Sequence, residues 1–405
     1  MRNISTYKYI TVFILLSIIL NPVNGQDEQE ETKYEYRAFQ FTFLFPPLST
    51  NGINNINCIN DFSINPFIGF SGGVGIFEAA GFINIDRYTV TGIQLAGFGN
   101  TVGDYVNGVQ VAGFYNVTGG SMNGVQAAGF INLAGTEVKG VQAAGFMNIG
   151  GGTFDGVQAA GFMNIAGETG SSVQAAGFGN VSGNGSAEFQ ASGFFNAANE
   201  VEGAQIAGFM NMADNVKGVQ VAGFINICDS IDGVPLGFIN IVKKNGFRAF
   251  EISISEVQYL NLSYKMGVKK LYTIYSFGKP FGASSRWMYG AGLGTQLDLS
   301  ERMLMNIEGT VHQELWVAHP DATRFLYIDR VNLYNTVKFI FGWTTNNSIS
   351  LHLGPTLNVG VSGDNTYSTV SERDLIAPYT LTKFKSHSNN TTTQIWFGLQ
   401  GGIRF

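Results

Sequence analysis

The middle of the chain consists of short blocks in which apolar and polar residues alternate. Residues 141–149 are a typical block and read VQAAGFMNI. One parity of this block carries Val, Ala, Gly, Met and Ile, and the other carries Gln, Ala, Phe and Asn. An alternation with period two is typical of a β-strand. Eleven such blocks occupy residues 77–241, so we predict eleven β repeats of 14–16 residues in this region.

The repeat is defined by a Phe, by an Asn two residues after it and by a Gln four residues before it. The Phe positions are Phe82, Phe98, Phe114, Phe130, Phe146, Phe162, Phe178, Phe194, Phe209, Phe224 and Phe238. The Asn positions are Asn84, Asn100, Asn116, Asn132, Asn148, Asn164, Asn180, Asn196, Asn211, Asn226 and Asn240. Nine of the eleven copies have the Gln, among them Gln142 and Gln158, and Glu78 replaces it in the first copy. Atypical end copies are expected at the caps of a repeat array.

Two all-β architectures could use this unit. In a β-solenoid each copy is one coil, and equivalent residues stack in rows ~4.8 Å apart. In an antiparallel meander each block would be one strand of a large outer-membrane barrel that includes the repeats. The connections keep one length and keep an apolar residue eight before the Phe, as a second short strand of a coil would. We therefore predict a β-solenoid-like repeat array combined with an antiparallel β-barrel, and the single large barrel is the alternative.

The repeated side chains have a structural interpretation. Stacked amides hydrogen-bond along a row and hold the register of neighbouring strands, as in cross-β assemblies. A polar binding ladder is the alternative role for these rows. We expect Phe146 to stack between Phe130 and Phe162 in the core. The structural repeat positions we assign are Phe98, Asn100, Phe114, Asn116, Phe130, Asn132, Gln142, Phe146, Asn148, Gln158, Phe162 and Asn164.

The flanking segments have longer alternating strands. Residues 242–405 contain runs of 10–14 residues in which apolar and polar residues alternate, such as 289–299 and 349–361. Strands of this length exceed the usual five or six residues and are typical of an outer-membrane barrel. We expect strands in residues 34–76 to join this barrel and to close it against residues 392–405. A barrel of eight to ten strands would be filled by side chains or hold one small ligand, and would not be a wide pore. A soluble β-sandwich is the alternative.

Both ends of the sequence carry targeting patterns. Residues 1–25 have basic residues, then an apolar run from Tyr9 to Leu20, then small Gly25, which predicts a signal peptide. A buried N-terminal helix is the alternative. Residues 26–33 are acidic and polar, and we expect a disordered tail. At the other end one strand face carries Phe397, Leu399, Ile403 and Phe405. This face resembles the signal read by the outer-membrane insertion machinery, although Gly401 is one place away from the usual pattern.

Composition excludes several classes of function. Charged residues are 13% of the chain, about half of what soluble domains carry, and the formal net charge is −6. This balance argues against nucleic-acid binding, which needs a basic face. The two Cys do not make a disulfide framework. The four His form no His-Glu-x-x-His motif, and no Gly-x-Ser-x-Gly or phosphate-binding loop occurs. We expect neither an enzyme nor a metal or cofactor site.

The Gly-Val-Gln-x-Ala-Gly-Phe-x-Asn repeat, seen best in Gly140–Ile149 and Gly156–Ile165, resembles that of bacterial surface-repeat outer-membrane proteins. The resemblance covers residues 34–405 and implies a location, not a reaction. We therefore expect an exported, non-enzymatic protein of the outer membrane or cell surface, whose barrel anchors it and whose repeats present a surface. Its partners would be outer-membrane lipid and surface proteins or glycans, not nucleic acid. The alternatives are an outer-membrane pore that uses the repeats as strands, and a secreted soluble adhesin.

Overall fold

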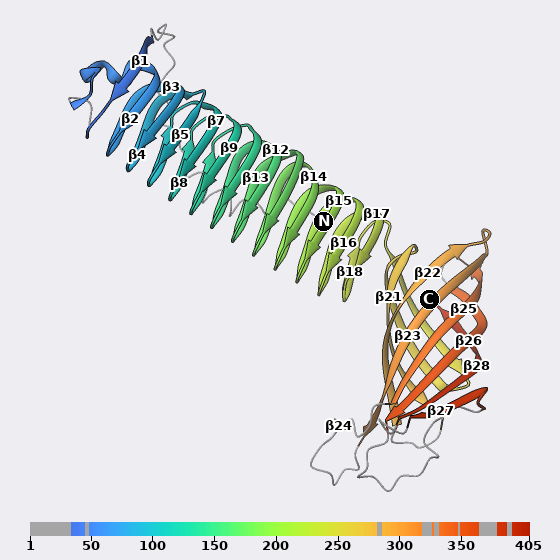
Figure 1. Ribbon diagram of the computed structural model, residues 1–405. Helices are drawn as coiled ribbons and strands as arrows, with labels where there is room; N and C mark the ends of the chain where they lie inside the picture. Colours follow the sequence, from blue (N-terminus) through green and yellow to red (C-terminus); the bar gives the residue numbers. More distant parts are fainter. Residues whose placement is uncertain are drawn as a thin grey trace. The chain divides into compact units, whose positions relative to one another are not determined.

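The computed structural model describes residues 34–44, 48–281, 286–317, 326–327, 332–346, 349–363, 379–386 and 391–405. The predicted signal peptide and N-terminal tail lie outside the described residues. The described chain forms an 18-stranded sheet and a 10-stranded sheet (Figure 1). It divides into two compact units, Met1–Gly185 and Ser186–Phe405, and each is described by itself.

The first sheet contains the repeats, drawn in blue to yellow-green in Figure 1, and one 3₁₀-helix, Gly52–Asn57. Its strands are β1 Glu35–Phe41, β2 Cys58–Asn65, β3 Ile68–Ala80, β4 Ile83–Val90, β5 Ile93–Ala96, β6 Gly99–Val102, β7 Tyr105–Ala112, β8 Tyr115–Thr118, β9 Met122–Ala128, β10 Ile131–Ala134, β11 Val138–Ala144, β12 Met147–Ala160, β13 Met163–Ala176, β14 Gly179–Ser192, β15 Phe195–Ala207, β16 Met210–Ala222, β17 Ile225–Leu236 and β18 Ile239–Val242.

Each strand of this sheet pairs in parallel with the equivalent strand of the neighbouring coil. In β11, Gln142 lies opposite Gln126 of β9 and Gln158 of β12, an offset of one repeat in each direction. Parallel pairing at the repeat interval defines a β-solenoid, here of about 12 turns. The predicted fold class is confirmed. The alternative, one large antiparallel barrel that includes the repeats, is wrong, because antiparallel strands cannot place identical residues opposite each other along the whole array.

A corner divides each block into two strands. The backbone bends at Gly145–Phe146, between β11 and β12, so Gln142 and Asn148 both point into the coil. A Cβ on Gly145 would lie 2.1 Å from the carbonyl oxygen of Gly129 in the adjacent coil, which explains why glycine occupies this corner. The single nine-residue strand that the alternation predicts is therefore interrupted. The alternation of inward and outward side chains is interrupted where the chain turns.

The Phe row lies at this corner and is only partly buried. The ring of Phe146 stacks between Phe130 and Phe162, with ring centroids 4.8 and 4.9 Å apart. Phe130 nevertheless keeps 37% of its surface exposed, and Phe114 keeps 40%. The expectation that these rings fill the core does not hold. They form a stacked surface row because the corner turns the side chain of Phe away from the polar interior.

The apolar core of the coil comes in most copies from the residue eight before the Phe. In the first unit Val106, Met122, Val138 and Phe154 are buried and pack together with Ala134 and its equivalents. In the second unit Val201, Val216 and Ile231 take the same place. These residues lie on the strand that also carries the Gln, as Val138 and Gln142 do on β11, and not on a separate second strand as the sequence predicts. Each coil thus combines an apolar row with the buried Gln and Asn rows.

Residues 34–76 belong to the solenoid. Strand β1 pairs in parallel with β2, and β2 pairs in parallel with β3. The prediction that these segments join the barrel is therefore not met within the described residues. The reason is visible at the inward positions, where Gln40, Ser63 and Asn65 are buried as the repeat amides are. The alternating Phe39 and Phe41, which favoured a barrel strand, lie exposed on β1.

The second sheet is an antiparallel barrel, drawn in yellow to red in Figure 1. Its eight strands are β19 Phe247–Ser255, β20 Gln258–Val268, β21 Leu271–Pro280, β22 Arg286–Asp298, β23 Met303–Val317, β25 Asn332–Asn346, β26 Ile349–Gly363 and β28 Thr391–Arg404. Two short strands, β24 Leu326–Tyr327 and β27 Thr382–Ser386, pair with β23 and β28.

The barrel closes between its first and last strands. Strand β19 pairs with β28, and the backbone amides of Phe250 and Phe405 donate to each other's carbonyl oxygens at 3.1 and 2.8 Å. The closing partner of residues 391–404 is thus the strand directly after the repeats. Closure leaves no free strand edge in the eight-stranded ring.

Candidate functional site

Two rows of amides run along the interior of the solenoid. In the first unit each Asn from Asn84 to Asn164 donates its Nδ2 to the Asn Oδ1 of the next coil at 2.8–2.9 Å. Each Gln from Gln110 to Gln174 donates its Nε2 to the Gln Oε1 of the preceding coil at 2.7–2.9 Å. The second unit repeats both rows, for example between Gln205 and Gln190 at 2.8 Å. These side chains are fully buried.

The predicted repeat positions therefore occupy two different environments. Asn100, Asn116, Asn132, Asn148 and Asn164 form the interior Asn row, and Gln142 and Gln158 belong to the interior Gln row. Phe98, Phe114, Phe130, Phe146 and Phe162 form the corner row outside. Because the amides are enclosed and bonded to one another, they hold coils together and are not accessible to a ligand. This arrangement agrees with the structural role and not with a polar binding ladder.

The two amide rows point in opposite directions, so their ends need different partners. The first donor of the Gln row, Gln94 Nε2, bonds Glu78 Oε2 at 2.8 Å. A carboxylate suits this place because it only accepts hydrogen bonds. The last acceptor, Gln220 Oε1, finds no hydrogen-bond partner among the described residues, since Pro235 stands opposite Gln220 in the next coil. The last donor of the Asn row, Asn240 Nδ2, bonds the carbonyl oxygen of Gly237 at 3.0 Å.

Glu78 has a second buried acid beside it. The carboxyl groups of Glu78 and Asp86 are hydrogen-bonded to each other and are almost fully enclosed. Burial raises the pKa of Glu78 above its ordinary value. Burial, and then the charge of Glu78, raise the pKa of Asp86 well above its ordinary value. Two adjacent carboxylates cannot both ionise without a large cost, so the pair holds a proton. The sequence analysis identified Glu78 as the replacement for Gln in the first copy but missed its partner Asp86, two residues after Asn84.

The barrel interior is an ion-pair network. Lys265 Nζ bonds Glu251 Oε2 at 2.7 Å and Glu308 Oε1 at 2.5 Å. Arg404 donates to Glu251 Oε2 at 2.9 Å, and Arg286 pairs with Glu314. Buried charges are found in proteins where they are paired. The strand parity in the sequence indicates that these side chains face inward, but the partners could not be read from one strand at a time.

The barrel exterior is apolar. Outward positions on its strands include Ile252, Leu293, Val311, Phe339, Leu353 and Leu357, all exposed. The four residues assigned to the insertion signal, Phe397, Leu399, Ile403 and Phe405, lie on this outer face of β28 and beyond its end, and Leu399 is 63% exposed. The barrel thus reverses the usual distribution, with its charges inside and its apolar side chains outside.

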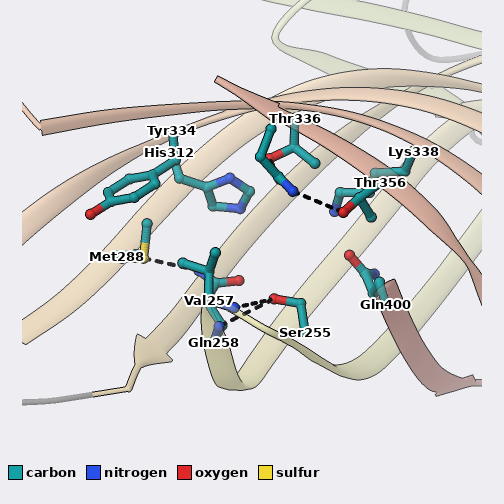
Figure 2. Close-up of a pocket in the computed structure, with 11 residues that line it drawn as sticks. Ser255, Val257, Gln258, Met288, His312, Tyr334, Thr336, Lys338, Thr356 and Gln400 are labelled. Atoms are coloured by element: carbon teal, nitrogen blue, oxygen red, sulfur yellow. Dashed lines mark hydrogen bonds between the residues drawn. The ribbon is translucent and has the colours of Figure 1, made fainter. Parts of the chain in front are cut away.

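One small cavity lies inside the barrel (Figure 2). It is bordered by Gln258, Met288, His312, Lys338 and Thr356, and its volume of about 20 Å³ is enough for one water. His312 is buried and shares a hydrogen bond of 2.8 Å between its Nε2 and Ser276 Oγ. Buried polar and charged side chains, such as those of Glu251, Lys265 and Arg404, also occupy the interior of the described barrel.

Within the described residues, no cluster of three His, Cys, Asp or Glu side chains could hold a metal ion. Cys58 and Cys228 are free and buried, and burial raises the pKa of the Cys228 thiol to about 12, which keeps it unreactive. Across the ranges described, no helix has the length and apolar character needed to cross a membrane. Neither a protein-family model, nor a curated protein, nor a solved structure matches the chain.

The amide rows and the Phe row should differ in their effect on stability. Asn148→Ala removes the acceptor of Asn132 and the donor to Asn164, and should lower the free energy of unfolding by roughly 2–5 kcal/mol. Phe146→Ala removes two stacked ring contacts from a partly exposed site, and should cost about 1–3 kcal/mol. Asn123→Ala, at an exposed amide, is the control. Urea unfolding measures all three, and a larger loss for Phe146→Ala would contradict the packing.

The acid pair should make the first coils less stable at higher pH. In both groups the folded pKa is raised, so the folded state binds more protons than the unfolded state. The stabilisation that these two groups contribute is fully present below their ordinary pKa values of 3.8 and 4.5. It is lost as the pH rises through their folded pKa values, by about 1.4 kcal/mol per pH unit and proton. Glu78→Gln should flatten this dependence, and exposed Glu168→Gln should leave it unchanged. Urea unfolding across this pH range tests it; parallel profiles for parent and Glu78→Gln would refute it.

Proposed function

We propose that this protein is a non-enzymatic bacterial outer-membrane protein, in which the barrel is embedded in lipid and the solenoid presents a surface for interaction. The observation that carries the proposal is the barrel exterior. Its outward side chains are apolar around the ring, whereas charges are kept inside. In water such a surface would be unfavourable, since soluble proteins rarely expose a continuous apolar patch of this extent.

The distribution of aromatic residues supports a lipid setting. Near one end of the strands the outer face carries Phe250, Phe341, Trp343 and Phe405. Near the other end it carries Tyr259, Phe277 and Tyr289, and aliphatic side chains such as Leu293 and Leu353 lie between. Two aromatic belts around an aliphatic band are the pattern of outer-membrane barrels. The strands, of 9 to 15 residues, are long enough to cross a bilayer when tilted.

An anchor fits this barrel better than a pore. Ion pairs and buried polar side chains fill the interior, and the cavity at Lys338 holds no more than a water-sized volume. The repeats, being a parallel solenoid, do not widen the barrel. The pore alternative required the repeats as barrel strands, and the repeats do not form such strands.

The outer surface of the solenoid supports a role in binding. On each coil the outward positions before and at the corner carry Val, Ala, Gly and Phe, as at Val141, Ala143 and Phe146, whereas Glu137, Lys139 and Asp155 lie in the connections. A repeated uncharged surface of this kind is suited to extended partners such as surface proteins or glycans. The net charge of −6 disfavours nucleic acid.

A charge placed on the outer face of the barrel tests its lipid setting. In the parent refolded into phospholipid vesicles, unboiled and boiled samples should migrate differently in SDS, because a closed barrel offers detergent no strand edge. Leu399→Arg should lose this shift or lower its yield, since an arginine on the lipid face costs about 2–4 kcal/mol at mid-membrane. Leu48→Arg, on an exposed leucine of the first unit, should keep it. Equal behaviour of the two variants would count against a lipid-facing barrel.

The location is tested in cells. We expect the full chain in the outer-membrane fraction, with the solenoid cleaved by protease added to intact cells and the barrel protected. Recovery from the culture supernatant would instead favour the secreted adhesin. A solenoid cleaved only after the cells are opened would place it on the inner side of the membrane and remove its role at the surface.

A further inference from the structure

Lys338 is a buried cation that pairs with no described residue. It lies on β25 with only 4% of its surface exposed. Among the described residues its ammonium group makes neither a hydrogen bond nor an ion pair, whereas Lys265, Arg286 and Arg404 each bond a carboxylate. An enclosed charge is costly unless something compensates it.

The nearest acid along the sheet is already engaged. Glu308 stands directly opposite Lys338 in the pairing of β23 with β25. Its Oε1 accepts from Lys265 at 2.5 Å and from the hydroxyl of Tyr272 at 2.8 Å, and lies 3.5 Å from Arg404. The hydrogen bonds of this carboxylate go to Lys265, Tyr272 and Arg404, and none goes to Lys338 across the sheet.

The carboxylates of the barrel interior are bonded to groups other than Lys338. Among the described residues of the barrel, the buried carboxylates are Glu251, Glu308 and Glu314, and the buried cations are Lys265, Arg286, Lys338 and Arg404. Each of these three carboxylates pairs with a cation other than Lys338. Glu256, which is less deeply buried, accepts from Asn358 Nδ2 at 2.8 Å, Trp396 Nε1 at 3.1 Å and the amide of Leu399 at 3.0 Å.

The unpartnered lysine borders the cavity of Figure 2, together with His312, Thr336 and Thr356. Thr356 is opposite Lys338 in the pairing of β25 with β26. Its hydroxyl oxygen accepts from Asn358 Nδ2 at 2.9 Å, so its own hydrogen remains available to donate. A cation and a hydroxyl donor therefore meet at a space of about 20 Å³.

We propose that this cavity binds one small monovalent anion of the size of chloride, held by the ammonium of Lys338 and the hydroxyl of Thr356. The volume admits a water or a single-atom ion, and excludes phosphate, sulfate and organic acids. The anion supplies the charge partner that Lys338 lacks among the described residues. The site does not depend on the membrane location or on any partner of the solenoid.

Bromide serves as the crystallographic probe. In crystals of the full chain grown with sodium bromide, an anomalous peak should lie within hydrogen-bond distance of Lys338 Nζ and be missing from crystals of Lys338→Met. A cavity that holds only water in bromide-grown parent crystals would overturn the proposal. The same is true of a bromide peak that persists unchanged in Lys338→Met.

Thermal unfolding gives an independent test in solution. Replacing sodium gluconate by sodium chloride at equal ionic strength should raise the Tm of the barrel by about 2–4 °C, since an anion bound only to the folded state stabilises it. Lys338→Met should lose this shift, and Lys383→Met, at an exposed lysine on β27, should retain it. If Lys338→Met does not fold, the parent protein alone provides the test. A Tm of the parent that does not change with chloride would contradict the anion site.

Discussion

The solenoid depends on one constraint, that an amide removed from water must find a hydrogen-bond partner. Asn148 is fully enclosed, and the group that satisfies it is the same residue one coil away. A slip of one residue along the strand would leave both rows without partners and would turn the apolar row outward. The period of the sequence is therefore a consequence of hydrogen bonding as much as of hydrophobic burial. Burial of the apolar core stabilises the contact between coils, and the side-chain amide hydrogen bonds fix their register.

The same constraint explains the ends of the array. A row of identical donors and acceptors satisfies its own interior but leaves one unsatisfied group at each terminus. Glu78 resolves this for the Gln row by offering only acceptor atoms, and it brings Asp86 and a bound proton with it. At Gln220, where Pro235 cannot supply an amide, the acceptor stays unsatisfied. The barrel meets the same requirement with ion pairs, and Lys338 is the one buried lysine or arginine of its described residues that they do not include.

Most of the fold could be predicted from the sequence, because repeat spacing and strand alternation are local signals. The side of the sheet on which each row of side chains lies could not be predicted. Alternation places Gln142 and Phe146 on one face, whereas the bend at Gly145–Phe146 sends the Gln inward and the Phe to the corner. The prediction for segment 34–76 was wrong for a related reason. Its alternating aromatic residues are typical of barrel strands, whereas its buried Gln40 and Asn65 match the inward amides of the solenoid. The pairing of Lys265 with Glu251 and Glu308 joins distant strands, and a single sequence does not reveal such contacts.

The opposite sense of the two amide rows has a consequence for how such a protein can change its length. Every Gln amide points towards the preceding coil and every Asn amide towards the following one, so their dipoles within a coil largely cancel. An added coil then brings no growing electrostatic imbalance, and it presents the same upper and lower surfaces as its neighbours. Gene duplication of one sixteen-residue unit can extend the array in steps of ~4.8 Å without redesigning either end. The length of the solenoid can thus change in evolution by the gain or loss of whole repeats.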